Sequence, residues 1–346
     1  MKSAVFVKPG QMMVKEVAQP KIQEVDDVVI KVIRACVCGS DLWKYRGLDA
    51  KETNSDNTGH EALGVVTATG QNISTVQPGD FVIVPFTDGC GHCAACLAGF
   101  DGSCSVNKGR LHTGTQAEYV LMKHCEWSLI KIPGKPADYS DGMLNSLLTL
   151  ADVMATGYHA ARVAEVQRGD SVVVVGDGAV GLCGVLAAKI RGAKQIIALS
   201  RHEDRQKLAL EFGATDIVAE RGEEAVQKVM SLTHNAGMDA VLECVGTDLA
   251  VQTALQVGRP GAIVGRVGLP HEPQTDLSQY FYKNIRIAGG PASVTTYDKQ
   301  FLLQAVLDGN IRPGKVFTKQ FNLDQIDQAY QAMDQRQAIK SLVVID

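Results

Sequence analysis

VVVVGDGAVGLCGVLAAKIRG, residues 172–192, decides the fold of this chain. Its opening run of valines suits a strand buried on both faces, as in a parallel sheet. The apolar residues that follow recur with helical spacing, which predicts a helix over 179–192. Between them stands the glycine spacing G-x-G-x-x-G. Because it joins a buried strand to a helix, this spacing favours a turn that binds a dinucleotide; the alternative is a glycine-rich turn without a ligand.

Each glycine of this turn has a physical role. Gly176 would make the tight turn, Gly178 would let the backbone approach a pyrophosphate, and Gly181 would let helix and strand pack closely. The helix N-terminus would face the phosphates. We therefore predict that the nucleotide is contacted by Gly176, Gly178, Ala179, Val180 and Gly181.

Strand and helix patterns alternate beyond this turn. Further strands are predicted at 195–200, 215–220, 237–246 and 261–268, and helices at 203–214, 223–233 and 248–257. Such alternation predicts an α/β fold, a Rossmann doubly wound parallel sheet with crossover helices.

The first 150 residues have a different pattern, with short strands expected at 26–37, 62–70 and 81–85 between turn residues. The end of the chain, from about 325, reads as a helix followed by a strand. It looks like the first region resuming, so we expect the alternating part to be inserted within a β-rich domain.

Length and composition limit the class of protein. A chain of 346 residues suggests two domains. A net charge of −4 and a pI near 6.1 give no general attraction to nucleic acid or to an anionic membrane. From the start MKSAVFVKPG and the interrupted apolar runs, we expect no signal peptide and no membrane span. With nine cysteines, we expect a reducing, cytoplasmic location in which cysteine clusters bind metal.

The end of the second predicted strand bears on the choice of cofactor. An NAD site usually has an acidic residue there, which bonds the ribose 2′-hydroxyl. This chain has Ser200 and Arg201, which could instead receive a 2′-phosphate. We therefore expect NADP(H) to be preferred over NAD(H), although Glu203 and Asp204 lie close by. The alternative is that Arg201 is only a solvated surface charge.

Three residues spread along the chain could form a catalytic metal site. Cys38 follows a predicted strand and His60 precedes another. A catalytic zinc needs three protein ligands and one open position. The third ligand could be Asp152, because an acidic residue in an apolar helix start is costly unless it is paired or coordinated. Its alternative role is that of a helix N-cap.

Four cysteines lie close together in TDGCGHCAACLAGFDGSC, residues 87–104. From their residues alone, they could form a nucleic-acid-reading zinc module, a redox switch, a disulfide framework or a structural metal clip. The stretch lacks the basic residues that a nucleic-acid module would have. These cysteines are Cys90, Cys93, Cys96 and Cys104.

These motifs occur in one order: Cys38-Gly39-Ser40-Asp41, Gly59-His60-Glu61, the four-cysteine lobe, Asp152 before Thr156-Gly157, and the glycine turn. In this combination the chain resembles the zinc-dependent medium-chain alcohol dehydrogenases over nearly its whole length. The aspartate as third ligand resembles the bacterial secondary-alcohol and threonine-dehydrogenase-like branch.

The resemblance implies two domains. Residues 1–151 and 285–346 would form a catalytic domain with a GroES-like β-barrel core, and residues 152–284 a Rossmann dinucleotide-binding domain. A structural zinc lobe would span about 87–107. There the four cysteines would hold one zinc with no open position, in addition to one catalytic zinc per chain.

The resemblance also implies a mechanism. Zinc held by Cys38, His60 and Asp152 would act as a Lewis acid on the substrate oxygen, and Ser40 would contact that oxygen and take its proton. Hydride would pass between the substrate carbon and the nicotinamide.

Other residues near these ligands have supporting roles in this hypothesis. Asp41 would orient His60, while Glu61 would be an outer neighbour of the metal, a transient fourth ligand or simply part of an ion pair. Trp43 stands where many relatives carry a proton-relaying histidine. Trp43 and Phe86 would line the substrate pocket, or else pack in the core.

The sequence therefore predicts an enzyme that transfers hydride between a small primary or secondary alcohol and NADP(H). The alternatives are a polyol, sugar or amino-alcohol dehydrogenase of the same family and, in a different class, a non-catalytic NADP(H)-binding protein. The expected partner is a small alcohol or carbonyl compound, with no nucleic acid and no membrane. By resemblance, we expect a homodimer or homotetramer.

Overall fold

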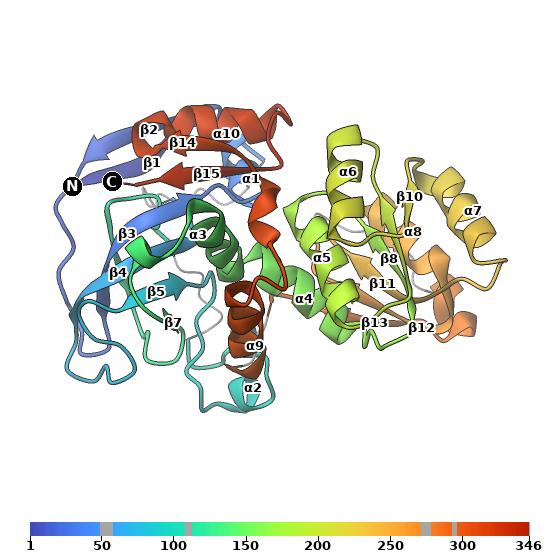
Figure 1. Cartoon of the computed structure of the whole chain (residues 1–346), viewed down its shortest axis with the longest axis horizontal. Helices are drawn as coiled ribbons and strands as arrows, with labels where there is room; N and C mark the ends of the chain where they lie inside the picture. Colours follow the sequence, from blue (N-terminus) through green and yellow to red (C-terminus); the bar gives the residue numbers. More distant parts are fainter. Residues whose placement is uncertain (49–57, 108–112, 271–277, 293–295, 346) are drawn as a thin grey trace. The chain divides into compact units, whose positions relative to one another are not determined.

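The computed structural model describes residues 1–48, 58–107, 113–270, 278–292 and 296–345. The chain divides into two compact units (Figure 1). Unit 1 comprises Met1–Asp152 and Ser293–Asp346, and unit 2 comprises Val153–Ala292. Unit 2 includes the strand at Arg286–Gly289, which belongs to its sheet.

The described part of unit 2 contains a six-stranded, entirely parallel sheet in the order β10-β9-β8-β11-β12-β13. The predicted doubly wound α/β fold is therefore confirmed. Central β8 is buried along its whole length, as its valine run predicted. The strands are β8 (Ser171–Val175), β9 (Gln195–Leu199), β10 (Asp216–Val218), β11 (Met238–Glu243), β12 (Gly258–Arg266) and β13 (Arg286–Gly289).

Helices cover both faces of this sheet (Figure 1). One face is covered by α7 and α8, whose apolar residues form a common core with Val173 and Val175 of β8. Helix α6 ends at Gly213, which has φ +116° and closes the helix in the left-handed conformation that glycine adopts easily. The helices are α4 (Val153–Val163), α5 (Ala179–Ile190), α6 (Glu203–Phe212), α7 (Gly222–Leu232), α8 (Asp248–Val257) and the 3₁₀ helix η4 (Ser278–Lys283).

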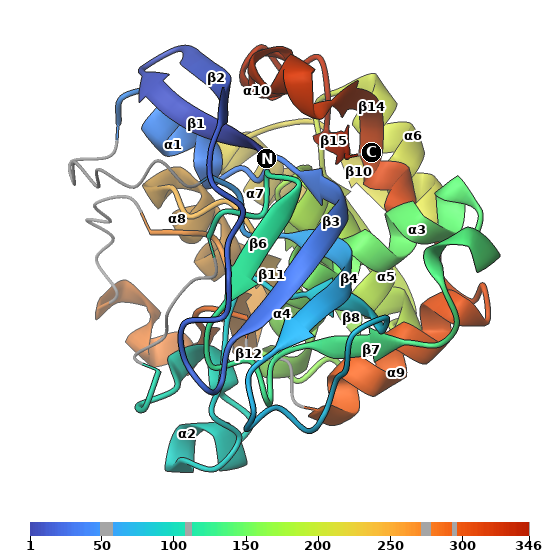
Figure 2. The same cartoon turned by 90° about the vertical axis from the view of Figure 1, so that its left-hand side faces the viewer.

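Unit 1 is built around a mainly antiparallel sheet in the order β14-β15-β3-β4-β5-β7 (Figure 2). Strand β3 pairs with β4, with β6 and with β15, so residues 340–344 complete a sheet that starts at residue 28. Strands β1 and β2 pair with each other in a separate antiparallel hairpin. The strands are β1 (Lys2–Lys8), β2 (Gln11–Glu16), β3 (Val28–Cys36), β4 (Ala62–Thr69), β5 (Phe81–Val84), β6 (Tyr119–Met122), β7 (Ile130–Ile132), β14 (Phe317–Asn322) and β15 (Lys340–Val344).

The helices of unit 1 are mostly short and lie in the connections. They are α1 (Asp41–Tyr45), α2 (Ala94–Leu97), η1 (Asp101–Ser103), η2 (Pro136–Asp138), α3 (Asp141–Leu148), η3 (Thr149–Ala151), α9 (Thr296–Leu307), η5 (Pro313–Val316), η6 (Leu323–Gln325) and α10 (Ile326–Asp334). Among the residues placed by the structure, no helix is long and apolar enough to cross a membrane.

Close packing of α4 on α5 generates a stability prediction. A Cβ atom at Gly157 of α4 would lie 2.6 Å from the Gly184 nitrogen and 2.7 Å from the Cys183 carbonyl carbon, both in the backbone of α5. Because backbone cannot turn aside as a side chain can, Gly157→Ala should destabilise the protein by about 1–3 kcal/mol and lower its melting temperature. The control is Gly142→Ala in α3, where a Cβ meets nothing within 4 Å. Equal melting temperatures for both variants would contradict the prediction.

Candidate functional site

Four potential metal ligands come together in unit 1. The donor atoms of Cys38, His60, Glu61 and Asp152 all lie within 4.8 Å of one another. Cys38 Sγ is 3.3 Å from Asp152 Oδ2, and His60 Nε2 is 3.6 Å from the same oxygen. The three ligands predicted from the sequence are thus neighbours in space, with Glu61 as a fourth.

Strand pairing explains this convergence. Ala35 of β3 faces Ala62 of β4 in an antiparallel register, so the residues just after β3 and just before β4 meet at one end of the sheet. The segment that carries Asp152 is held by a main-chain hydrogen bond next to it. The Phe86 N–H donates to the Ala151 carbonyl over 3.0 Å. Residues far apart in the sequence are therefore positioned by main-chain hydrogen bonds.

The turn before His60 depends on glycine and on a buried glutamine. Gly59 has φ +78°, and a Cβ there would lie 2.5 Å from Cγ of Gln116. The Gln116 side chain donates to the Cys36 carbonyl over 3.0 Å and accepts from the Tyr330 hydroxyl over 3.0 Å. One buried amide therefore connects the turn before His60, the end of β3 and helix α10.

Asp41 lies where it can orient His60, the role expected of it. Asp41 Oδ1 is 3.4 Å from His60 Nδ1, and Asp41 Oδ2 accepts from the Cys38 N–H over 2.9 Å. Burial by itself lowers the pKa of His60, but Asp41 and the hydrogen bond to Asp152 outweigh it, so this pKa lies well above its ordinary value. Burial and the charge of Asp152 raise the pKa of the Cys38 thiol.

This donor set fits zinc. It combines a thiol, an imidazole and carboxylates, the ligand types of protein zinc sites. The carboxylates crowd negative charge into a buried space, where a divalent cation would neutralise it and would favour the thiolate form of Cys38. The arrangement can therefore hold a metal ion through three or four protein ligands.

Glu61 pairs with a residue that the sequence analysis missed. Its Oε1 accepts from Lys340 Nζ over 2.7 Å, and both side chains are only 1% exposed. Lys340 also donates to the Val37 carbonyl over 3.2 Å. Among the described residues, Glu61 Oε2 has no hydrogen-bond partner. Burial raises the pKa of Glu61, an effect that the charge of Lys340 partly opposes.

The predicted substrate-contacting residues occupy different surroundings. Ser40 is exposed just before α1, two residues beyond Cys38. Phe86 packs edge-on against His60, with ring centroids 6.2 Å apart. Trp43 is half-buried within α1. The structure thus brings Phe86 directly to a candidate ligand.

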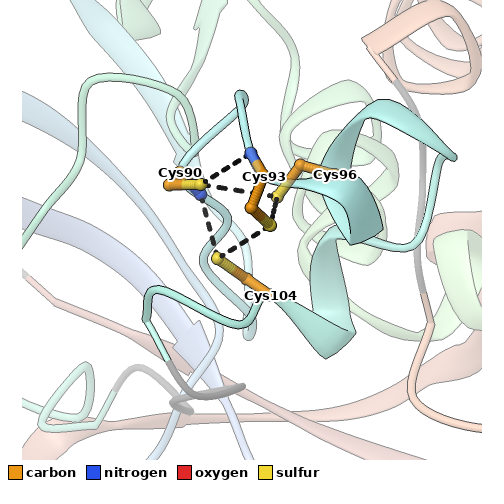
Figure 3. Close-up of side chains that lie close together, drawn as sticks. All are labelled: Cys90, Cys93, Cys96 and Cys104. Carbon is orange, nitrogen blue, oxygen red and sulfur yellow. Dashed lines mark hydrogen bonds between the residues drawn. The ribbon is translucent and has the colours of Figure 1, made fainter.

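The four cysteines of the lobe form a compact cluster (Figure 3). Their Sγ atoms are 4.0 Å apart between Cys90 and Cys96, 3.6 Å between Cys93 and Cys96, and 3.8 Å between Cys93 and Cys104. Four sulfurs bound to one zinc at about 2.3 Å in a tetrahedron are about 3.8 Å apart. All four are free cysteines, so the spacing fits a shared metal ion.

Polar contacts support this lobe from inside and outside. Hydrogen bonds, first from the Cys96 backbone and then from Ser105, lower the pKa of Cys93 to about 5, whereas burial raises that of Cys96 to about 12.

Lys299 of α9 pairs with the buried Asp101 of the lobe over 2.9 Å. Lys299, missed by the sequence analysis, therefore anchors the lobe to the last part of the chain.

The glycine turn of unit 2 has the shape of a phosphate cradle. Gly176 has φ +118°, and a Cβ at Gly181 would lie 1.9 Å from the Gly176 carbonyl oxygen. A Cβ at Gly178 would meet nothing within 4 Å, so the backbone is open to a ligand there. Gly178 begins α5 without a side-chain cap, which leaves the first N–H groups available to an anion. These features fit a dinucleotide pyrophosphate.

The end of β9 lies beside two further residues that the sequence analysis missed, Asp177 and Arg205. Ser200 is buried and donates to Asp177, the residue between the first two glycines, over 3.0 Å. Arg205 of α6 pairs with the same carboxylate over 3.0 Å. Arg201 is exposed. Arg205 lies four residues beyond Arg201, in the first turn of α6, a proximity in sequence that could have indicated a second cation near this position.

Comparison with known proteins agrees with the two units. A family model described as the alcohol dehydrogenase GroES-like domain matches residues 24–134, and one described as zinc-binding dehydrogenase matches residues 179–302. The GroES-like domain predicted for the first part of the chain is therefore confirmed.

Individual relatives match most of the chain. Zinc-type alcohol dehydrogenase B of Aspergillus flavus is 34% identical, covering 87% of this chain and 72% of that protein. A probable zinc-binding alcohol dehydrogenase of Mycobacterium tuberculosis is 32% identical over 95% of this chain and 84% of its own length. The structure of an alcohol dehydrogenase from a Thermus species matches with a TM-score of 0.89, 31% identity and 100% coverage of both chains.

The buried pair of Glu61 and Lys340 generates a prediction. Lys340→Met would leave a buried carboxylate without its cation, which typically costs about 3–5 kcal/mol, so the midpoint of urea unfolding should fall. The double variant Glu61→Gln with Lys340→Met should recover part of the loss, because the amide carries no charge. Lys2→Met, which breaks an exposed pair with Asp324, is the control and should change little. No shift for Lys340→Met would contradict the prediction.

Proposed function

The chain belongs to the zinc-dependent medium-chain alcohol dehydrogenase family, and we propose that it transfers hydride reversibly between a small primary or secondary alcohol and NADP(H). One observation carries this proposal: Cys38, His60, Glu61 and Asp152 bring their donor atoms within 4.8 Å of one another. A non-catalytic relative would have no need of a thiol, an imidazole and two carboxylates at a single buried place.

In this proposal Cys38, His60 and Asp152 would hold the catalytic zinc. When bound, the ion would supply Lewis-acid chemistry at the substrate oxygen. Asp41 keeps the His60 ring turned so that Nε2 faces Asp152, over the contacts of 3.4 and 3.6 Å. Lys340 holds Glu61 beside these three residues through the buried 2.7 Å pair.

Proton transfer and substrate contact fall to side chains around these ligands. Ser40, exposed two residues beyond Cys38, would accept the proton of the substrate hydroxyl at its Oγ while its own hydroxyl proton passes to a solvent water. Phe86, packed on the His60 ring, forms an apolar wall that excludes water beside the reacting oxygen. Trp43 narrows the pocket from α1.

A structural zinc is proposed for the lobe. Four sulfurs at tetrahedral spacing would close its shell and leave no position for substrate. The ion would hold an irregular segment with little packing of its own, since Leu97 and Phe100 there are exposed.

For the cofactor, we propose binding on the glycine turn with a preference for NADP(H). Backbone N–H groups of residues 178–181 would receive the pyrophosphate. The exposed Arg201, next to the buried Ser200, would attract a 2′-phosphate. The nicotinamide, when bound, supplies the hydride acceptor or donor.

The two units would have separate tasks. We propose that unit 1 is the catalytic domain and unit 2 the dinucleotide-binding domain, and that the protein works in the cytoplasm, where a reducing environment keeps its nine cysteines available as thiols.

The metal assignment is tested by elemental analysis and activity. We expect two zinc ions per chain in the unaltered protein and one in Asp152→Ala. Reduction of small ketones and aldehydes with NADPH should fall at least ~100-fold, because a catalytic ion contributes several kcal/mol of charge stabilisation. The control Asp308→Ala, at an exposed aspartate, should keep both ions and full activity. One zinc per chain that survives Asp152→Ala, with no activity on any carbonyl compound, would refute the proposal.

The sheet edge of unit 2 supports a homodimer. Strand β13 is an edge strand, with Ile287 exposed, and Phe281 and Tyr282 nearby in the sequence are 76% and 88% exposed. An unpaired edge beside exposed apolar side chains is a template for another strand. We propose that two copies pair along β13 about a twofold axis, and that two such dimers can form a homotetramer.

The oligomer prediction is checked by light scattering after gel filtration. Ile287→Lys should shift the mass towards the monomer, because a lysine on the edge opposes strand pairing. Leu210→Lys, at an exposed leucine of α6, should leave the mass unchanged. A monomeric unaltered protein, or an Ile287→Lys variant of unchanged mass, would contradict this interface.

A further inference from the structure

Asp177 occupies the variable position between the first two glycines of the turn, and its carboxylate makes two contacts. Oδ2 accepts from the Ser200 hydroxyl over 3.0 Å, and Oδ1 pairs with Arg205 Nη1 over 3.0 Å. Arg205 also donates to the Asp177 carbonyl over 3.3 Å. Asp177 therefore connects the glycine turn, the end of β9 and helix α6.

These contacts determine how Ser200 can meet a ligand. A carboxylate only accepts hydrogen bonds, so the Ser200 hydroxyl must direct its single proton at Asp177. Ser200 is 2% exposed, which leaves it little freedom to turn elsewhere. While this bond persists, Ser200 can accept from a ribose hydroxyl but cannot donate to a phosphate oxygen.

The same contacts determine the local charge. Arg205 and Asp177 pair with side chains only 14% and 19% exposed, so much of the Arg205 charge is already neutralised. The exposed Arg201 is then the main cation for a 2′-phosphate. A carboxylate beside that phosphate disfavours it, because like charges repel more strongly away from bulk water. A neutral 2′-hydroxyl meets no such repulsion and can donate to the carboxylate.

We propose that Asp177 is a specificity-determining residue of the nucleotide site. It accepts a hydrogen bond from the adenine ribose and opposes a 2′-phosphate, so that the chain uses NAD(H) as well as NADP(H) and its preference for NADP(H) is limited. In this role Asp177 replaces the acidic residue that the end of β9 lacks. The inference rests on the proposed nicotinamide-dependent function.

A purely structural role for Asp177 makes a different prediction. If the carboxylate only clamps the glycine turn to α6, its loss should weaken the binding of every nucleotide by a similar factor. A specificity role changes the ratio between nucleotides with and without the 2′-phosphate. The ratio is therefore the quantity to measure.

The experiment uses isothermal titration calorimetry on the zinc-loaded protein, with 2′,5′-ADP and 5′-AMP as probes that need no turnover. Asp177→Asn retains the size of the side chain and removes its charge. We expect the ratio of Kd for 5′-AMP to Kd for 2′,5′-ADP to rise about tenfold, the effect of a single charge contact near 1.4 kcal/mol. Arg205→Gln should lower the same ratio.

Two further variants serve as controls. Asp204→Asn removes one charge from the exposed start of α6, without a contact to Ser200 among the described hydrogen bonds, and should change the ratio less than about twofold. Asp177→Ser, a smaller polar replacement, should raise the ratio in the same direction as Asp177→Asn.

The outcomes separate this inference from the proposed function. If the unaltered protein binds both probes and Asp177→Asn and Asp177→Ser weaken both equally, the specificity role is overturned while nucleotide binding stands. The specificity role is also overturned if Asp204→Asn changes the ratio as much as Asp177→Asn. If the unaltered protein binds neither probe and neither NADP⁺ nor NAD⁺, the proposed function and this inference both fail.

Discussion

The candidate catalytic site depends on neutralising negative charge in a buried space. Glu61 and Asp152 bring two carboxylates together beside the Cys38 thiol, and isolated buried carboxylates are very unfavourable. Lys340 neutralises Glu61 from strand β15, and a divalent cation would neutralise Asp152. The site therefore depends on the pairing of β15 with β3, which places Lys340 beside Glu61.

A similar arrangement recurs in unit 2. Asp177 lies in a turn that the proposed function assigns to an anionic ligand, and Arg205 and Ser200 accommodate its charge. In both places a carboxylate is held by a cation from another secondary-structure element, 279 residues away for Glu61 and 28 residues away for Asp177. In unit 1 the remaining negative charge would favour a metal ion. In unit 2 the charge of Asp177 would determine whether a ribose 2′-phosphate or a 2′-hydroxyl binds better.

The cysteine lobe illustrates what the spacing of cysteines predicts and what it leaves open. From their residues alone the four cysteines left several alternatives open, and the family resemblance implied one shared ion. The sulfur separations of 3.6 to 4.0 Å fit such an ion. A contact that holds the lobe to its surroundings is the pair of Asp101 and Lys299, which are 198 residues apart. The attachment of the lobe therefore depends on the fold and not on the local spacing.

The sequence by itself determined the elements whose signals are local. The valine run, the glycine turn and the alternation of strands and helices after it predicted the parallel sheet of unit 2. These signals are local, because hydrophobic periodicity and turn residues are visible in neighbouring positions of the sequence. Cys38, His60 and Asp152 were also identifiable, as reactive residue types placed at the ends of apolar segments. Only the tertiary structure decided that Lys340 pairs with Glu61, that Arg205 and Ser200 share Asp177, and that β13 extends unit 2 to Ala292. These contacts form between segments that the fold brings together. The residues next to a side chain in the sequence do not indicate which residue of another segment it will contact.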